Sequence, residues 1–360
     1  MVPHLLRYLE AEKFELNLNM SDITESFKQF SFRVGTNFNY VQGAGGNSSI
    51  KINDRKMLIK ASGKWLKNAL DEDIFVAVDW QHINKAIATD ESRALDSALN
   101  TAHTSAFKPS IETTMHSLMP HKVVLHTHSL NALTILVQQD CKTLLEKKLQ
   151  GINWSFIPYC RPGFPLTQLV QKATTDKECD VLLIQNHGLV VGGSTPEKTL
   201  TSMLEIEKRL SINPSEQKNL KTTTRQPIEN KKFLFSDSDV INRIAFNDNT
   251  IRIATGGSLY PDHVVFLGSG LAFAENIPTA ISSLQKCFTE PLHPKAVIVS
   301  NQGVIHSRNL SPAGVEMLLT IAKISSRIPK DAQIKYLTKS EELDLITWDK
   351  EQYRQKPDNS

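Results

Sequence analysis

Three histidines stand where they could bind a divalent transition metal. His126 and His128 follow a three-residue apolar run that is typical of a buried strand. Because alternate residues of a strand point to one face, the two imidazoles lie side by side. His187 stands at a predicted turn between two further apolar runs. Zinc is the metal that such ligands most often bind. The alternatives are structural or surface roles for the pair and a hydrogen-bonding turn role for His187.

Glu112 is the candidate for moving a proton beside such a metal. A helix is predicted over residues 111–119 with Ser110 as N-cap, which places Glu112 in the first turn. A carboxylate there can act as a general acid or base whose pKa depends on the neighbouring metal. The alternative is a carboxylate that only interacts with the helix dipole. His116, one turn later, is expected to contact the core or to support the site.

Two turns are candidates for binding an anion. Residues 43–49 (GAGGNSS) allow backbone N–H groups to approach a ligand closely, and residues 60–64 (KASGK) carry a hydroxyl and two cations. Neither segment has the spacing of a P-loop or a dinucleotide-binding loop, so no NAD is expected. Together the turns could cradle a phosphate, whereas each alone is also typical of an ordinary flexible turn.

Alternating helices and strands must position these side chains, which predicts an α/β layered domain. Helices are expected from Asp22 onward and over residues 111–119, 129–137, 165–172 and 196–210. Strands are expected at residues 48–52, 57–59, 75–78, 123–125, 181–184 and 189–191.

A polar stretch over residues 211–232 separates this domain from a second unit. We expect a domain over 1–215, a linker over 216–234 and a smaller α/β domain of unknown role over 235–360. No internal repeat is expected. His263, next to Asp262 in a loop bounded by glycine and proline, is more typical of a turn, with a contribution to a site as the alternative. Predicted strands of the second unit are 251–253, 264–266 and 296–299, and its predicted helices are 278–286 and 312–326.

The composition is that of a globular chain rather than a disordered one. The 360 residues include 41 basic and 38 acidic side chains, and 40% are hydrophobic. The basic residues are scattered, so no nucleic acid partner is expected. No apolar window of 18 residues exists, so no membrane partner is expected. The N-terminus lacks the features of a secretory signal and the four cysteines form no CxxC pair, which together indicate a cytoplasmic protein.

In this order and approximate spacing, the motifs resemble the class II aldolase/adducin family over roughly residues 25–215. The matching stretches are GGNSSIK at 45–51, SG at 62–63, SIE at 110–112, HTH at 126–128 and NHGLVV at 186–191. L-fuculose-phosphate and L-rhamnulose-phosphate aldolases are its metal-dependent enzymes. The whole chain also resembles the aldolase half of bacterial aldolase/short-chain dehydrogenase fusion proteins, through residues 256–264 and an ending around 338–353.

The resemblance implies a three-layer α/β/α domain and a zinc-dependent lyase that cleaves a phosphorylated ketose through a metal-stabilised enediolate. Glu112 would move the proton, and one Zn²⁺ per chain would be held by His126, His128 and His187. The family suggests a homo-oligomer, with a tetramer favoured. The residues that would bind the sugar phosphate are Asn47, Ser62, Gly63 and Ser110, with Lys64 as a compensating cation.

Other reactions stay open within the same resemblance. Relatives with the same histidine triad include epimerases, decarboxylases and dehydratases of sugar-derived substrates, whereas adducin-like relatives serve interactions and have lost the metal ligands. The three retained histidines count against that non-catalytic role. Ile111 stands where sugar-phosphate aldolases often have a second serine, so the substrate is left undetermined.

Overall fold

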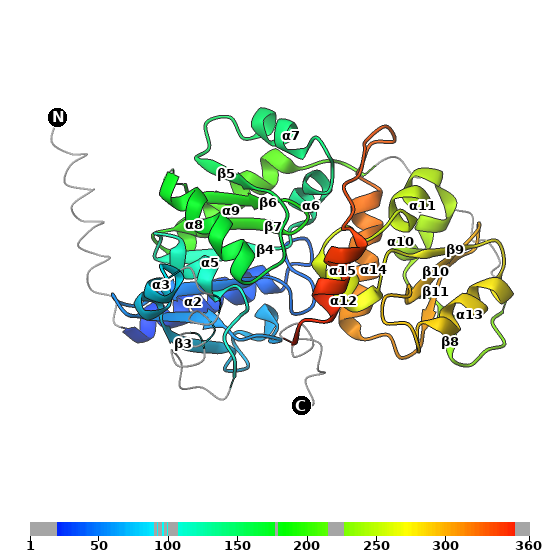
Figure 1. The fold of residues 1–360 in the computed structure, drawn as a ribbon, viewed down its shortest axis with the longest axis horizontal. Helices are drawn as coiled ribbons and strands as arrows, with labels where there is room; N and C mark the ends of the chain where they lie inside the picture. Colours follow the sequence, from blue (N-terminus) through cyan, green and yellow to red (C-terminus); the bar gives the residue numbers. More distant parts are fainter. Residues whose placement is uncertain are drawn as a thin grey trace.

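The computed structural model describes residues 20–89, 107–176, 179–214 and 227–349, together with Ser92, Asp96 and Leu99. Two sheets lie side by side (Figure 1). Between them lie the helices α12 (Pro261–Leu267), α14 (Pro312–Ser325) and α15 (Lys339–Ile346). Most of the predicted linker, including residues 216–226, and the end of the chain from residue 350 lie outside the described residues. Within the described residues, no helix has both the length and the apolar character needed to cross a membrane.

The first sheet has seven strands in the order β3-β2-β1-β4-β7-β6-β5. Only β5 and β6 run parallel, and the other neighbouring pairs are antiparallel. The central strand β4 pairs on one side with β1 and on the other with β7, so that His126 lies opposite both Asn47 and Val190. The bounds are β1 (Asn47–Lys51), β2 (Lys56–Lys60), β3 (Phe75–Asp79), β4 (Val123–Thr127), β5 (Trp154–Ile157), β6 (Val181–Ile184) and β7 (Gly188–Gly193).

Helices cover both faces of this sheet, which confirms the three-layer α/β/α architecture. Val123 and Leu125 of β4 pack under one helical layer, and Val124 packs under the other. By this alternation, His126 and His128 face the same layer as Val124. The first layer consists of α2 (Met20–Gly35), α6 (Leu130–Leu136), α7 (Cys141–Lys148) and α9 (Pro196–Leu210). The second consists of α3 (Trp80–Ile87), α5 (Thr113–Leu118) and α8 (Phe164–Asp176).

The C-terminal unit, residues 227–349, contains a second sheet of four strands in the order β8-β11-β10-β9. Its strands are β8 (Phe233–Phe235), β9 (Ala272–Ala274), β10 (Ala296–Val299) and β11 (Gly303–Ser307). Its helices are α10 (Asp239–Asn242), α11 (Asp248–Thr255), α12 (Pro261–Leu267), α13 (Ile277–Lys286), α14 (Pro312–Ser325) and α15 (Lys339–Ile346).

Two strands that the sequence predicted in this unit are wrong. Residues 251–253 lie in α11, where the Asn247 side chain caps the helix and Thr250, Ile253 and Ala254 are buried at helical spacing. Residues 264–266 lie in α12, which begins with Pro261 at a position where proline favours a helix start. Short apolar runs do not distinguish a buried helix from a strand. The residues that favour a helix here are at the helix starts, the cap Asn247 and the first-turn Pro261.

The second sheet repeats the pairing of part of the first one, which corrects the expectation of no internal repeat. The strands β8, β11, β10 and β9 correspond to β4, β7, β6 and β5, and in both sets only the last pair is parallel. The turns that follow β6 and β10 each contain an asparagine with a φ of +51°, Asn186 and Asn301. A glycine follows two residues later in both turns.

The correspondence extends to the helices that follow these strands. Ser129 and Ser238 cap the helices after β4 and β8. Thr195 and Ser311 cap α9 and α14, and both helices have proline at their first position. The repeat escapes notice in the sequence because identity is confined to such turn and cap residues.

Helix α6 joins the cores of the two units. One side of it packs in the core of the first sheet, through Ala132, Ile135 and Leu136. The other side packs in a core that it shares with α14, through Leu130, Leu133 and Val137. The chain also crosses between the units by a backbone hydrogen bond of 2.8 Å from Lys335 N to the carbonyl oxygen of Val137.

Candidate metal centre and active site

The three predicted histidines meet in one buried cluster. His126 and His128 extend from the end of β4, and His187 lies in the turn between β6 and β7. One ring nitrogen from each lies within 4.8 Å of those of the other two. The ring centroids are 5.0 Å apart for His126 and His128, 5.0 Å for His126 and His187, and 5.6 Å for His128 and His187.

The donor set of this cluster fits a divalent metal. Nδ1 of His126 lies 3.1 Å from the carbonyl oxygen of Leu189, to which its N–H donates. Nε2 of the same ring then carries a lone pair, and it is buried with no hydrogen-bond partner among the described residues. A hydrogen bond that fixes the tautomer of a metal-binding histidine is a common feature of such sites.

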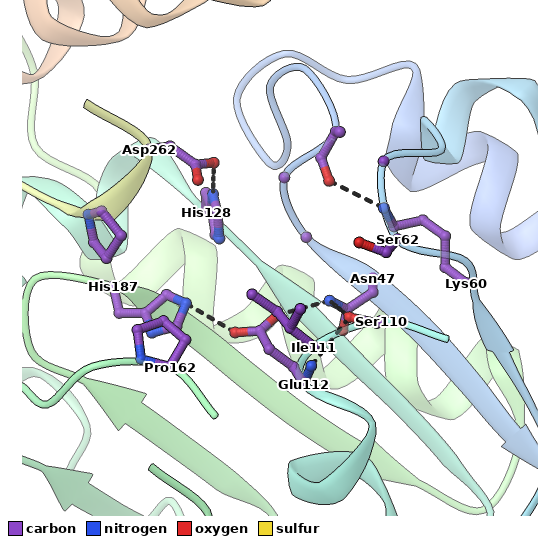
Figure 2. Close-up of a pocket in the computed structure, with 15 residues that line it drawn as sticks. Asn47, Lys60, Ser62, Ser110, Ile111, Glu112, His128, Pro162, His187 and Asp262 are labelled. Carbon is purple, nitrogen blue, oxygen red and sulfur yellow. Dashed lines mark hydrogen bonds and ion pairs between the residues drawn. The ribbon is translucent and has the colours of Figure 1, made fainter. Parts of the chain in front are cut away.

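Glu112 faces this cluster directly (Figure 2). Its Oε1 lies 2.9 Å from Nε2 of His187, and its Oε2 lies 3.5 Å from Nε2 of His126. Burial raises the pKa of Glu112, but the neighbouring His126 and His187 outweigh it and hold this pKa well below the usual range. The carboxylate is therefore ionised and positioned to exchange a proton beside the histidines.

The start of α5 differs from its predicted form. The helix covers Thr113–Leu118, and Glu112 rather than Ser110 occupies the N-cap position. The hydroxyl of Ser110 instead accepts hydrogen bonds from the backbone N–H of Glu112 at 3.3 Å and from Nδ2 of Asn47 at 3.1 Å. This short turn before the helix aims Glu112 at the cluster.

A chain of buried hydrogen bonds fixes the orientation of Glu112. Nδ2 of Asn47 donates to Oε2 of Glu112 at 2.7 Å, so Oδ1 of Asn47 accepts the N–H at Nε2 of His116. Nδ1 of His116 then accepts the hydroxyl of Ser49 at 2.8 Å. Burial lowers the pKa of His116 to about 4, so the ring stays neutral. Its Nε2 then donates to Asn47, and its Nδ1 accepts from Ser49. His116 thus lies behind the site, which it contacts through Asn47.

The two glycine-containing turns line the same pocket as Glu112. Ser62, Gly63 and Ser110 are in its wall, together with Gly45 and Gly46. Asn47 is in this wall as well, with its amide engaged as described. Four of the five residues predicted to bind phosphate thus line the same pocket as Glu112.

Lys64 is the predicted residue that is not brought to this pocket. Its Nζ lies 3.1 Å from Oε2 of Glu72. Lys60, at the end of β2, lines the pocket instead. Its buried Nζ donates to the carbonyl oxygens of Ala44 and Lys64, at 3.0 and 2.6 Å. The sequence indicated two cations in this turn, but their spacing alone did not indicate which one faces inward.

Asp262 reaches the cluster from the C-terminal unit and was not predicted. Its Oδ2 lies 3.1 Å from Nδ1 of His128, and both side chains are buried. Gly45 leaves room for this contact, since a Cβ there would lie 2.7 Å from Nδ1 of His128 and 3.0 Å from Oδ2 of Asp262. No local pattern connects residues 134 positions apart (262 minus 128), so only the fold reveals this contact.

Comparison with known proteins gives partial matches. The chain is 26% identical over 195 residues to the uncharacterized oxidoreductase YuxG of Bacillus subtilis, a match that covers 49% of this chain and 28% of that protein. It is 27% identical over 210 residues to the 3-oxo-tetronate 4-phosphate decarboxylase of Haemophilus influenzae, covering 54% of this chain and 88% of that one. Of the Bacillus relative, then, the chain matches less than a third of the length.

Solved structures include one of the N-terminal class II aldolase domain of a conserved protein from Thermoplasma acidophilum. It is 26% identical to this chain with a TM-score of 0.48, and the alignment covers 54% of this chain and 94% of that one.

The family comparison covers most of the first unit. Residues 31–213, just over half of the chain, match the model of the class II aldolase and adducin N-terminal domain. This range includes the histidine cluster, Glu112 and both pocket turns. The chain therefore belongs to the class II aldolase and adducin family.

Proposed function

We propose that the chain is a divalent-metal-dependent lyase that cleaves a phosphorylated ketose by a retro-aldol reaction. The observation that carries this proposal is the buried convergence of His126, His128 and His187 beside the ionised carboxylate of Glu112. These histidines would hold the metal, with zinc favoured, and it would supply Lewis acidity toward the substrate oxygens.

Glu112 is proposed as the acid and base of the reaction. An ionised carboxylate can accept a hydroxyl proton from the substrate and return it to the carbon released by bond cleavage. Asn47 supports this role because its amide holds Oε2 and thereby directs Oε1 toward the cluster.

The pocket turns are proposed to bind the substrate phosphate. The hydroxyls of Ser62 and Ser110 and the backbone of Gly63 lie in the pocket wall, where phosphate oxygens could accept hydrogen bonds. Asn47, also predicted to bind the phosphate, lies beside them, but both hydrogens of its amide donate to Ser110 and Glu112. We assign the supporting positive charge to Lys60 rather than to Lys64, because Lys60 lines the pocket and Lys64 faces Glu72.

Decarboxylation of a keto sugar-acid phosphate is the second candidate. The relative from Haemophilus influenzae is named for such a reaction, and the match covers 88% of its length. Loss of carbon dioxide and retro-aldol cleavage both leave an electron pair on a carbon next to a carbonyl group. The same cluster and acid/base residue could therefore serve either reaction.

A substrate panel with metal analysis tests these proposals. Protein loaded with Zn²⁺ should retain about one ion per chain after dialysis, as three ligands from one cluster imply. Ketose 1-phosphates would be scored for release of dihydroxyacetone phosphate, and 3-oxo sugar-acid phosphates for release of carbon dioxide. Aldehyde and ketone products support the first reaction, and carbon dioxide supports the second. Failure to retain metal, or silence of the whole panel with metal bound, contradicts both.

We further propose that the chain forms a homo-oligomer, with a tetramer favoured by the family resemblance. Light scattering coupled to size-exclusion chromatography gives the mass directly, and a mass near 40 kDa would contradict the proposal.

A further inference from the structure

The C-terminal unit contacts three segments that build the candidate metal centre. Asp262 lies against His128, as described above. Nδ2 of Asn186, the residue before His187, donates to the carbonyl oxygens of Leu259 and Lys335 at 2.7 and 2.6 Å. In the glycine-rich loop, the backbone N–H of Gly43 donates to a carboxylate oxygen of Glu316 at 2.5 Å.

Nδ1 of His128 and Oδ2 of Asp262 lie 3.1 Å apart without hydrogen-bond geometry, so Asp262 acts on His128 through its negative charge. A buried carboxylate 3.1 Å from Nδ1 favours the proton at that nitrogen and leaves the lone pair on Nε2. A carboxylate in this position also restricts the orientation of the ring. Pro261 and Asp262 line the pocket itself, so the second unit forms part of its wall.

The contact with Asn186 fixes the turn that carries His187. A φ of +51° is uncommon for a residue other than glycine, and the two hydrogen bonds hold Asn186 in that conformation from outside its own unit. The corresponding Asn301 has the same φ, but its Nδ2 donates to Ser300, its immediate neighbour. The backbone N–H groups of Asn186 and Asn301 both donate to distant carbonyl oxygens, those of Leu136 and Ala245. Long-range anchoring through the asparagine side chain is therefore the feature that distinguishes the turn with the histidine.

We propose that the C-terminal unit positions the histidines of the metal centre. In this proposal, Asp262 is a positioning residue for His128, and Leu259 and Lys335 position His187 through Asn186. The inference rests on the proposed metal site, and it assigns a role to a unit that lies outside the residues matched by the family model.

Metal affinity of the full chain tests the role of Asp262. Metal-free protein would be titrated with Co²⁺ and followed by visible absorption, with Zn²⁺ competition to obtain affinities. We expect Asp262→Ala to weaken binding by about 10- to 100-fold, as for loss of other partners of metal-binding histidines. Asp262→Asn, which keeps an acceptor oxygen, should lose less. Asp248→Asn, an exposed residue in the first turn of α11, is the matched control and should bind as the wild type does.

A spectroscopic signal separates positioning from general damage. In nitrogen-15 spectra of the histidine rings, Zn²⁺-loaded wild type should show His128 with its proton on Nδ1, and Asp262→Asn should retain this signal. Loss of the signal or a change of tautomer is expected in Asp262→Ala. Unaltered ring signals and unaltered affinity in Asp262→Ala would overturn the role of Asp262.

A second pair of variants tests the turn. Asn186→Gly keeps the positive φ but removes both hydrogen bonds, and Asn301→Gly makes the same change in the corresponding turn. Weaker Co²⁺ binding confined to Asn186→Gly supports the proposal, and equal affinity in the two variants overturns it for His187. Unfolding curves of the metal-free variants confirm that each chain is folded.

The wild-type titration keeps this inference distinct from the proposed function. If the wild type itself binds no Co²⁺ or Zn²⁺, the metal-dependent function fails and this inference fails with it. If the wild type binds one ion and the variants bind equally well, only the inference is overturned.

Discussion

The turn between β6 and β7 and the turn between β10 and β11 share an asparagine with a positive φ, but they carry different side chains. Asn186-His187-Gly188 occupies the first, and Asn301-Gln302-Gly303 the second. His126 pairs with Val190, and Phe235 pairs with Ile305, each partner standing two residues after the turn glycine. The positions of His126, His128 and His187 thus hold Phe235, Asp237 and Gln302 in the C-terminal unit.

The difference shows that this fold supplies positions and that individual side chains supply chemistry. Phenylalanine cannot bind a metal, and a single carboxylate with an amide is a poor site for a transition metal. Within the described residues, the second sheet also has no strands that correspond to β1–β3, which adjoin the turns proposed to bind phosphate in the first. The two units retain common packing, but the candidate chemistry is confined to one.

The largest effect on metal binding and turnover is expected when His187 is replaced by glutamine, the residue at the corresponding position of the second turn. His187→Gln removes one of three ligands, which should weaken Zn²⁺ binding by more than about 100-fold, beyond the loss expected for a supporting residue. Turnover of the substrate identified by the panel should fall to background. Metal content by elemental analysis and Co²⁺ titration measure this.

The converse change is its control. Gln302→His places a histidine in the second turn without the two partners from β8, so metal content should stay at about one ion per chain. A second bound ion in Gln302→His, or wild-type affinity in His187→Gln, would break the comparison.

Glu112→Gln should separate metal binding from turnover. The amide keeps the shape of the side chain but cannot accept a proton, and general acid/base catalysis contributes typically about 10²- to 10⁴-fold. We therefore expect kcat to fall by about 10³-fold while metal remains bound. Asp248→Asn, which changes an exposed carboxylate of α11, is the control for loss of a carboxylate and should leave kcat unchanged. Turnover that survives in Glu112→Gln contradicts the assigned role.

Loss of stability at low pH should arise in both units, whereas the candidate metal site is confined to the first. Burial lowers the pKa of His116 to about 4 and that of His263, in the C-terminal unit, to about 3. Below pH 6.5 these two histidines bind protons in the unfolded chain but stay neutral in the native chain. The free energy of unfolding therefore falls as the pH decreases toward these pKa values. For His116 the loss between pH 7 and pH 4 is on the order of 3 kcal/mol.

Denaturant unfolding of metal-free protein at pH 7, 6, 5 and 4 measures this loss. His116→Gln and His263→Gln should each flatten the profile by about 1 kcal/mol per pH unit near pH 5. The exposed His82 offers the control His82→Gln, which should leave the profile unchanged. An unchanged slope in His263→Gln would place the acid sensitivity in the first unit alone.

The smallest effect is expected from the cation of the pocket. Lys60→Met should weaken binding of inorganic phosphate, or raise the KM of a phosphorylated substrate, by about 10-fold because one charged donor is lost. Lys64→Met is the matched control and should have little effect, since Lys64 faces Glu72. A larger loss in Lys64→Met would reverse the assignment.

The sequence predicted the residues of the first unit because the chemistry there is encoded locally. An alternating strand fixes His126 and His128 on one face, and the turn after β6 places His187 opposite. The three-layer arrangement followed from the family resemblance and is confirmed by the helices on both faces of the sheet. The order of the motifs along the chain was enough to group these histidines with Glu112, because that order carries the family resemblance.

The remaining features depend on contacts between distant residues. Asp262 and His128 meet only because α12 packs beside the end of β4, and no periodicity predicts that approach. The repeat was missed because its signals are single turn and cap residues, such as Asn301 and Ser311. The C-terminal unit has no histidines at the positions that correspond to the candidate metal ligands. The side chains of Lys60 and Lys64 point in different directions because of the turn between them. The residue types alone do not specify these directions.

The position of α6 in two cores has a consequence for how the chain behaves when it is cut or denatured. A helix whose opposite sides stabilise different units makes neither core complete without the other. Fragments that end near residue 214 and begin near residue 227 should therefore assemble when they are produced together, as a split protein does. Truncation of Leu133 to alanine should lower the unfolding temperature of both units at once, so that calorimetry records a single cooperative transition.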